Sequence, residues 1–132
     1  MTLPLPPLCA LLLDDDTFIS ELIGQMLSDV GMREIYLESS PLHALATMKE
    51  HHPDLLICDL AIPEMDGIEF LKNIAKQGYR GGIIVISGMG CAVLKAAHSL
   101  ALSKGLLVLG AFEKPLTMID LQLALEKMPQ PQ

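Results

Sequence analysis

Aromatic side chains are scarce in this sequence. Phe, Tyr and Trp make up 4% of the 132 residues, and Trp is absent. Hydrophobic residues nevertheless account for 51% of the chain, so the core must be built from Leu, Ile, Val, Ala and Met. A chain of this length and composition is large enough to bury a proper core, and it predicts one domain.

Positive charge is also in short supply. Nine Lys and Arg residues stand against sixteen Asp and Glu, which gives a net charge of -7 at pH 7. Nucleic acids and anionic membrane surfaces are bound through basic clusters, so we expect neither to be a direct partner. No apolar run reaches the roughly 20 residues that cross a bilayer, and no targeting segment is convincing.

Cysteine is represented by three residues, Cys9, Cys58 and Cys91. Their number is odd, and their spacing matches no metal site. Reduced thiols in a cytoplasmic protein are therefore the expected state.

Short apolar segments alternate five times with segments of helical periodicity. The segments of strand length are 8–13, 34–38, 55–59, 83–86 and 106–109, the last continuing toward Ala111. Helices are predicted to begin near residues 17, 41, 66, 92 and 117; the fourth runs to Ser103 and the fifth to about Met128. Because crossovers between parallel strands are right-handed, this order predicts an α/β fold with a doubly wound parallel sheet and helices on both faces.

Polar side chains follow four of the five predicted strands. Asp14 and Asp15 end the first strand, Asp59 the third and Ser87 the fourth, while Lys114 follows the fifth. The carboxyl ends of parallel strands meet at one edge of a sheet, where ligands bind. Two carboxylates about 5 Å apart repel by roughly 3 kcal/mol at an effective dielectric near 20. A proton or a cation must therefore accompany this cluster, and an all-oxygen set favours Mg²⁺.

A carboxylate beside Mg²⁺, a hydroxyl and an ammonium group is suited to phosphoryl transfer, with the carboxylate as nucleophile. Each residue alone also has an ordinary interpretation. The run of acids at 14–16 could stabilise a helix N-terminus by interacting with the positive end of the helix dipole. Ser87 could be a turn residue, and Lys114 could be solvated. The arrival of a suitable residue at four separate strand ends favours a site over coincidence.

Over residues 8–128 the chain resembles a receiver domain of a two-component response regulator. The matching motifs are Leu-Leu-Leu-Asp-Asp-Asp at 11–16, Asp59 followed by Ile-Pro-Glu-Met-Asp-Gly at 62–67, Ile-Ser-Gly at 86–88 and Lys-Pro at 114–115. The resemblance implies a flavodoxin-like (βα)5 fold with strand order 2-1-3-4-5. It leaves residues 1–7 as an N-terminal tail and 129–132 as the start of a linker or a C-terminal tail.

The resemblance also implies a metal site and an acceptor. Asp59 would accept a phosphoryl group from a phosphohistidine on a sensor histidine kinase or a phosphotransfer protein. Mg²⁺ would be bound by the carboxylates of Asp15 and Asp59 and by the backbone carbonyl of Ala61, with Asp14 acting through water.

Two further residues of the resemblance would complete the site. Ser87 and Lys114 would contact the acyl phosphate, and the bond from Lys114 to Pro115 would be cis.

The chain departs from the family pattern three residues before the lysine, where many receivers carry an aromatic switch residue. That position is Ala111 here, and Phe112 follows it; Phe112 either substitutes for the switch or is simply packed. The segment from 87 to 115 resembles receivers fused to EAL-type cyclic-di-GMP phosphodiesterase domains. Signalling is expected through helix four, strand five and helix five, toward an effector in the same or another chain or by homodimerisation.

Three classes of function stay open at this point. The first is a phosphorylation-dependent switch that is not an enzyme beyond its own phosphorylation and dephosphorylation. The second is a Mg²⁺-dependent phosphohydrolase with an aspartyl nucleophile, which Ala61 disfavours because a second carboxylate would be needed at that position. The third is an interaction module that needs no phosphorylation.

Overall fold

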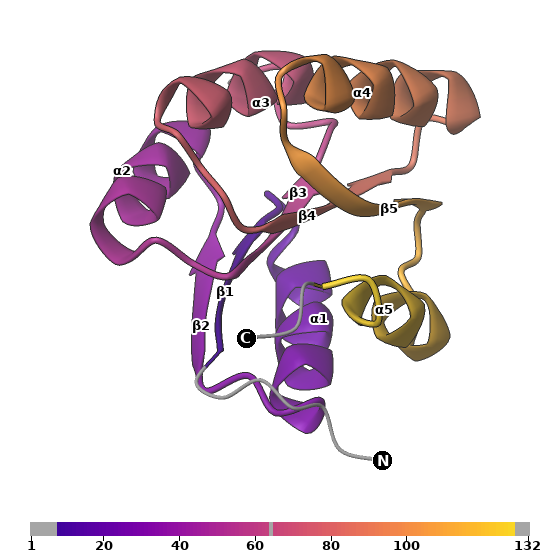
Figure 1. Cartoon of the computed structure of the whole chain (residues 1–132). Coiled ribbons are helices and arrows are strands. Elements are labelled where there is room, and N and C mark those ends of the chain that lie inside the picture. Colours follow the sequence, from indigo (N-terminus) through magenta and orange to yellow (C-terminus); the bar gives the residue numbers. More distant parts are fainter. Residues whose placement is uncertain (1–7, 64, 129–132) are drawn as a thin grey trace.

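The computed structural model describes residues 8–63 and 65–128 (Figure 1). The predicted N-terminal tail (1–7) and the predicted linker or C-terminal tail (129–132) lie outside the described residues. Among the described residues, no helix is both long and apolar enough to cross a bilayer.

Five parallel strands form one sheet in the order β2-β1-β3-β4-β5, which confirms the predicted doubly wound fold. The strands are β1 (Cys9–Leu13), β2 (Glu34–Glu38), β3 (Leu55–Asp59), β4 (Gly82–Ser87) and β5 (Leu107–Glu113). β3 is the central strand, and all five of its residues are buried, as expected for a strand covered on both faces.

Helices cover both faces of the sheet (Figure 1). One face carries α1 (Thr17–Asp29) and α5 (Met118–Leu125), and the other carries α2 (Pro41–His51), α3 (Gly67–Lys76) and α4 (Cys91–Ser103). The alternation of side chains along β3 divides the core accordingly. Leu56 and Cys58 pack on the α2–α4 side, while Leu55 and Ile57 pack on the α1–α5 side.

The loops after the strands are fixed by local interactions. Asp16 caps α1 by accepting the backbone N–H groups of Phe18 and Ile19 at 3.0 and 3.2 Å, an interaction worth about 1 kcal/mol. At the start of α3, a Cβ atom on Gly67 would lie 2.7 Å from the Cα of Leu60. Only glycine permits this contact, which holds the β3–α3 loop against the helix.

Some predicted boundaries were wrong. β5 continues to Glu113 rather than fading near Ala111, because Glu113 pairs with Ser87 at the end of β4. The fifth helix ends at Leu125 instead of about Met128, whereas α4 spans Cys91–Ser103 as predicted to within one residue.

β5 also contains an irregularity that its sequence did not signal. Ile83 pairs with Val108 and Ile84 with Gly110, so Leu109 is an extra residue in the strand. Beyond it, Ala111 packs with the α2–α4 core and Phe112 with the α1–α5 core.

Candidate functional site

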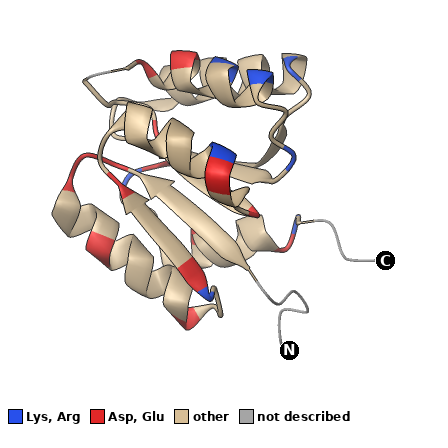
Figure 2. Cartoon of the chain, turned by 90° about the vertical axis from the view of Figure 1, so that its left-hand side faces the viewer, with Lys and Arg blue, Asp and Glu red and all other residues tan. Residues whose placement is uncertain are grey.

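The predicted site residues gather at the carboxyl-terminal edge of the sheet. Figure 2 shows acidic segments beside the ends of strand arrows, in addition to others spread along the helices. Asp14 follows β1, and Asp59 and Ser87 are the last residues of β3 and β4. Lys114 follows β5 directly, and its backbone N–H donates to the carbonyl of Ser87 at 2.9 Å. This bond extends the β4–β5 pairing by one step and starts the lysine side chain beside the acids.

Asp59 is held through both carboxylate oxygens. Its side chain is 2% exposed. Lys114 Nζ donates to Asp59 Oδ2 at 2.9 Å, and the backbone N–H of Ala61 donates to Oδ1 at 3.0 Å. The Ala61 N–H is a contact that the sequence could not reveal, because every residue except proline carries that group.

Asp14 is the most deeply placed acid, with 0% of its surface exposed. Its Oδ1 accepts the backbone N–H of Asp16 at 2.9 Å, and its Oδ2 lies 3.0 Å from Lys114 Nζ. Despite that ion pair, Oδ2 is buried without a hydrogen bond of good geometry. Burial, opposed in part by the N–H of Asp16 and by Lys114, raises the pKa of Asp14 above its ordinary value.

Lys114 is the cation that holds these two acids together. Its side chain is 24% exposed. Burial by itself would lower the pKa of Lys114, but the hydrogen bond to Asp59 and the ion pair with Asp14 outweigh it and raise the pKa. The ammonium group therefore remains charged at neutral pH. The peptide bond between Lys114 and Pro115 is cis.

Ser87 is fully buried, and its Oγ accepts the backbone N–H of Met89 at 3.0 Å. The hydroxyl proton remains available to donate to a group bound at the edge of the sheet.

Three carboxylates are placed to share a cation. One oxygen atom from each of Asp14, Asp15 and Asp59 lies within 4.8 Å of the others, and Asp15 is the exposed member of the set. The buried Oδ2 of Asp14 lacks a hydrogen bond, so a cation would satisfy it. Oxygen ligands without His or Cys suit a small hard ion that keeps several waters, which is Mg²⁺.

The structure shows whether Phe112 takes the place of the aromatic residue that is missing at position 111. Ala111 faces the α2–α4 side of β5. The ring of Phe112 lies across Gly110 and packs on the opposite, α1–α5 side, since a Cβ atom on Gly110 would fall 2.5 Å from that ring. Phe112 is packed, and it does not occupy the place of an aromatic at position 111.

Comparison with known proteins identifies relatives of this architecture. Residues 10–126 match the family model of the response regulator receiver domain. The chemotaxis protein CheY of Bacillus subtilis is 36% identical over 80 residues, covering 61% of this chain and 67% of that protein. A protein-glutamate methylesterase/protein-glutamine glutaminase of Dechloromonas aromatica is 40% identical over 68 residues, covering 51% of this chain but only 19% of that protein.

Solved structures give the same result. A response regulator from Colwellia psychrerythraea is 32% identical, with a TM-score of 0.75 over 89% of this chain and 92% of that one. A CheY-like receiver domain protein from Methanospirillum hungatei shares the fold, with a TM-score of 0.78, 23% identity and 92% of each chain covered. The match of the family model over most of the chain means that this chain belongs to the response regulator receiver family.

Proposed function

We propose that this chain is a phosphorylation-dependent switch that accepts a phosphoryl group on Asp59 from a phosphohistidine of a sensor histidine kinase or a phosphotransfer protein. The observation that carries the proposal is the contact of 2.9 Å between Lys114 Nζ and Asp59 Oδ2 at a buried sheet edge. A lysine from one strand end thus neutralises a carboxylate from another, where few waters compete with it.

In the proposed phosphoryl transfer, Asp59 is the nucleophile. A carboxylate oxygen of Asp59 attacks phosphorus, the bond from phosphorus to the imidazole nitrogen breaks, and the electron pair of that bond remains on the departing histidine. No proton must leave Asp59, because the carboxylate is already the nucleophile. Lys114 moves from the carboxylate to a phosphoryl oxygen, and the Ser87 hydroxyl donates to another.

Mg²⁺, bound by Asp15, Asp59 and the backbone carbonyl of Ala61 with Asp14 acting through water, would supply the further positive charge that phosphoryl transfer needs. The N–H of Ala61 holds Oδ1 of Asp59 and keeps the loop in place while the other oxygen reacts.

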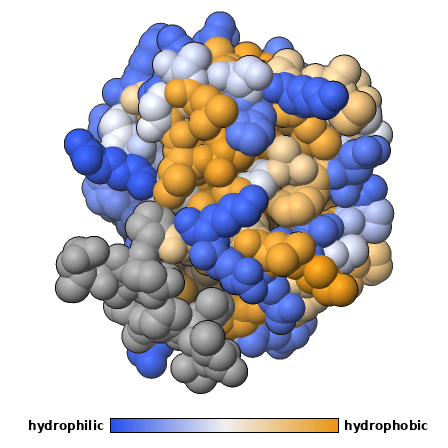
Figure 3. Space-filling view, turned by 45° about the vertical axis from the view of Figure 1, so that its right-hand side comes forward, coloured by the Kyte–Doolittle hydropathy of each residue, from blue (hydrophilic) through white to orange (hydrophobic). Residues whose placement is uncertain are grey.

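The surface formed by α4, β5 and α5 is the proposed output. Figure 3 shows hydrophobic surface in several patches, separated by hydrophilic side chains, on the side of the molecule that carries these elements. Leu102 on α4 and Ile119 and Leu123 on α5 are 61%, 68% and 51% exposed. Phosphorylation would shift an existing equilibrium of this surface toward binding an effector or a second copy of the chain. Ser87 would link the phosphorylation site to this surface, because its backbone carbonyl accepts the N–H of Lys114 at the end of β5.

Several parts of the proposal rest on the family resemblance. Output through an EAL-type domain remains a prediction. The free state of Cys9, Cys58 and Cys91 supports a reducing compartment, and we propose the cytoplasm.

Incubation with acetyl phosphate and Mg²⁺, followed by mapping of the label by mass spectrometry, tests the proposal. We expect one stable phosphoryl group on Asp59, and none in an Asp59→Asn variant. An Asp29→Asn variant, which changes an exposed acid on α1, is the matched control and should label normally.

The other outcomes identify the alternatives. Continuous release of phosphate in excess of the protein would support a phosphohydrolase. Absence of label from a folded protein that binds Mg²⁺ would support an interaction module independent of phosphorylation.

A further inference from the structure

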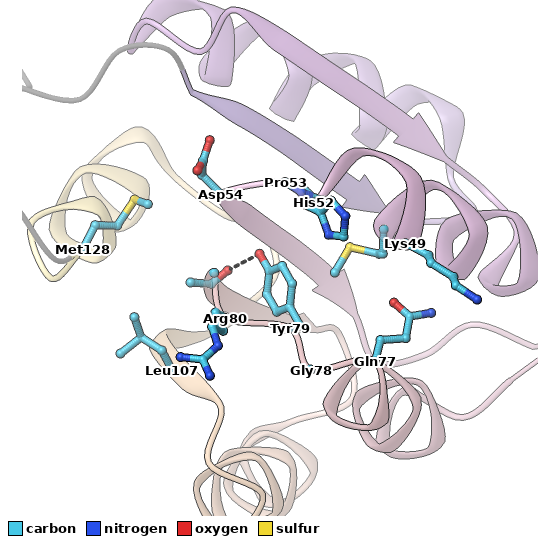
Figure 4. Close-up of a pocket in the computed structure, with 13 residues that line it drawn as sticks. Lys49, His52, Pro53, Asp54, Gln77, Gly78, Tyr79, Arg80, Leu107 and Met128 are labelled. Atoms are coloured by element: carbon cyan, nitrogen blue, oxygen red, sulfur yellow. Dashed lines mark hydrogen bonds between the residues drawn. The ribbon is translucent and has the colours of Figure 1, made fainter. Parts of the chain in front are cut away.

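A groove opens at the end of the sheet opposite Asp59, beside the first residues of β4 and β5. Its volume is about 480 Å³, and it is bounded by the end of α2, the α3–β4 loop and Met128 (Figure 4). A second hollow of about 430 Å³ shares the residues of the α3–β4 loop, Tyr79 and Arg80 among them, and Leu107, and it extends to Lys104. The two hollows therefore meet around one loop.

Positive charge collects along this groove. Lys49 and Arg80 line the larger hollow, and Arg80 and Lys104 line the smaller one. In the described part of the chain, ion pairs within 4 Å are made by Lys114 and His51, so none of these three side chains has an acidic partner. This concentration is unexpected in a chain whose net charge is -7.

The acid in the lining of the groove, Asp54, forms a hydrogen bond with the backbone outside the groove. Asp54 Oδ2 accepts the backbone N–H of Cys9 at 2.9 Å. In Figure 4 the Asp54 carboxylate points away from His52 and Tyr79. Asp54 is one acid against the three cations Lys49, Arg80 and Lys104 in the two linings, so positive charge remains in excess along the groove.

The rest of the lining combines apolar surface with fixed polar groups. Met48, Pro53 and Leu107 contribute apolar atoms. The Tyr79 hydroxyl donates to the carbonyl of Gly82 at 3.2 Å, which holds the ring in the wall of the groove (Figure 4). A hollow of several hundred Å³ with an apolar wall and a few polar groups is typical of a site for a small molecule.

We propose that this groove binds a small organic anion, with its phosphate or carboxylate group on Arg80 and its apolar body against Leu107, which is 37% exposed. The planar guanidinium group of Arg80 suits either oxyanion because it can donate two parallel hydrogen bonds. Lys49, at the end of α2, adds a further positive charge to the lining of the groove. This site is separate from the phosphoacceptor edge, and it does not depend on the function proposed for Asp59.

Titration of the ¹⁵N-labelled chain, without Mg²⁺ and at constant ionic strength, tests the proposal by NMR. The probes are phenyl phosphate, benzoate, inorganic phosphate and phenol. We expect saturable shifts of the amide signals of Gly78, Gly81 and Gly82 with phenyl phosphate or benzoate, and the tighter of the two identifies the preferred anion. Inorganic phosphate should bind more weakly because it lacks the apolar body, and phenol more weakly because it lacks the charge.

Matched variants make the result specific. Arg80→Gln should weaken binding about tenfold or more, as expected for loss of a charge-assisted hydrogen bond, and Lys49→Gln should weaken it less. Lys72→Gln removes the same charge from a residue outside both hollows and should leave binding unchanged. Shifts that do not saturate, equal binding of phenol, or equal weakening by Arg80→Gln and Lys72→Gln would each overturn the proposal.

Discussion

Charged side chains are buried and paired at one end of the sheet, and exposed and unpaired among the described residues at the other. At the carboxyl-terminal end, Lys114 lies between Asp14 and Asp59, two buried acids within 3.0 Å of its ammonium group. At the amino-terminal end, Lys49 and Arg80 are exposed beside a groove and have no acidic partner within residues 8–63 and 65–128. Buried charges interact strongly and depend on one another, whereas exposed charges contribute little to stability and remain free for a ligand. Substitutions at the first end should therefore change the fold and its chemistry together, while those at the second should change binding alone.

The largest effect is expected where backbone packing supports the acidic end. Gly67→Ala would place a Cβ atom 2.7 Å from the Cα of Leu60, so the β3–α3 loop must shift. We expect the free energy of unfolding to fall by about 1–3 kcal/mol, measured by urea denaturation, and labelling of Asp59 to slow. Gly88→Ala is the control, because its nearest neighbour is Lys114 Cδ at 4.0 Å. A Gly67→Ala variant as stable as this control would show that the contact is easily relieved.

Metal binding should separate Asp15 from its buried neighbours. Asp15 is exposed, so Asp15→Asn should change stability by no more than about 0.5 kcal/mol without Mg²⁺. With Mg²⁺ well above its dissociation constant, the wild type should gain about 1–3 kcal/mol through ligand linkage, and the variant much less. Thermal melts with and without Mg²⁺ measure the difference. An equal gain in both proteins would exclude Asp15 as a ligand.

The buried carboxylate of Asp14 should lower the stability of the protein when no cation is bound beside it. Without Mg²⁺, we expect Asp14→Asn to raise the free energy of unfolding at pH 7 by about 1 kcal/mol, since it removes a buried charge that lacks a full set of hydrogen bonds. The exposed Arg80→Gln at the other end should stay within about 0.5 kcal/mol of the wild type.

The pKa of Asp14 sets the pH dependence of that difference. Because burial raises this pKa in the folded state above the ordinary value of 3.8, the folded protein holds the proton more tightly than the unfolded chain. The wild type therefore loses stability as the pH rises from about 3.8 through the raised pKa. The advantage of Asp14→Asn should be small in acid and grow toward neutral pH. An advantage that shrinks as the pH rises would contradict this assignment.

The smallest effect concerns the thiols, which report on burial without altering the charge at either end. Cys91 is exposed, whereas burial raises the pKa of the buried Cys58 well above its ordinary value and that of Cys9 to about 11. We expect one rapidly reacting thiol in the native protein and three in urea, measured with a chromogenic disulfide reagent. Cys91→Ser should abolish the rapid phase. A rapid phase that survives this substitution would show that the protein opens around β1 or β3.

Much of the fold could be predicted because its strongest signals are local. The apolar run at 55–58 and the acid that follows it mark β3 and its end, and the cap at Asp16 and the glycine at 67 mark helix starts. The strand order came from the family resemblance, because no local pattern says which strands are neighbours. The end of β5 was misplaced for the same reason, since it depends on the pairing of Glu113 with Ser87.

The candidate site was predictable in its residue types but not in its bonds. Asp59 and Ser87 end a strand and Asp14 and Lys114 follow one, and parallel strands bring such residues to one edge. The side on which Phe112 packs could not be foreseen, because one extra residue in β5 shifts the alternation. The basic groove could not be foreseen either, because its cations lie far apart in sequence and each resembles an ordinary solvated side chain.

That extra residue in β5 has a consequence for the behaviour of the protein at high concentration. β5 forms one margin of the sheet, and the outer side of such a strand offers backbone groups on which another chain could add a strand of its own. Leu109 interrupts the regular spacing of these groups within β5. An interrupted margin is a poor template for such addition, so the irregularity opposes edge-to-edge association at β5, the margin that lies next to the exposed apolar side chains of α4 and α5.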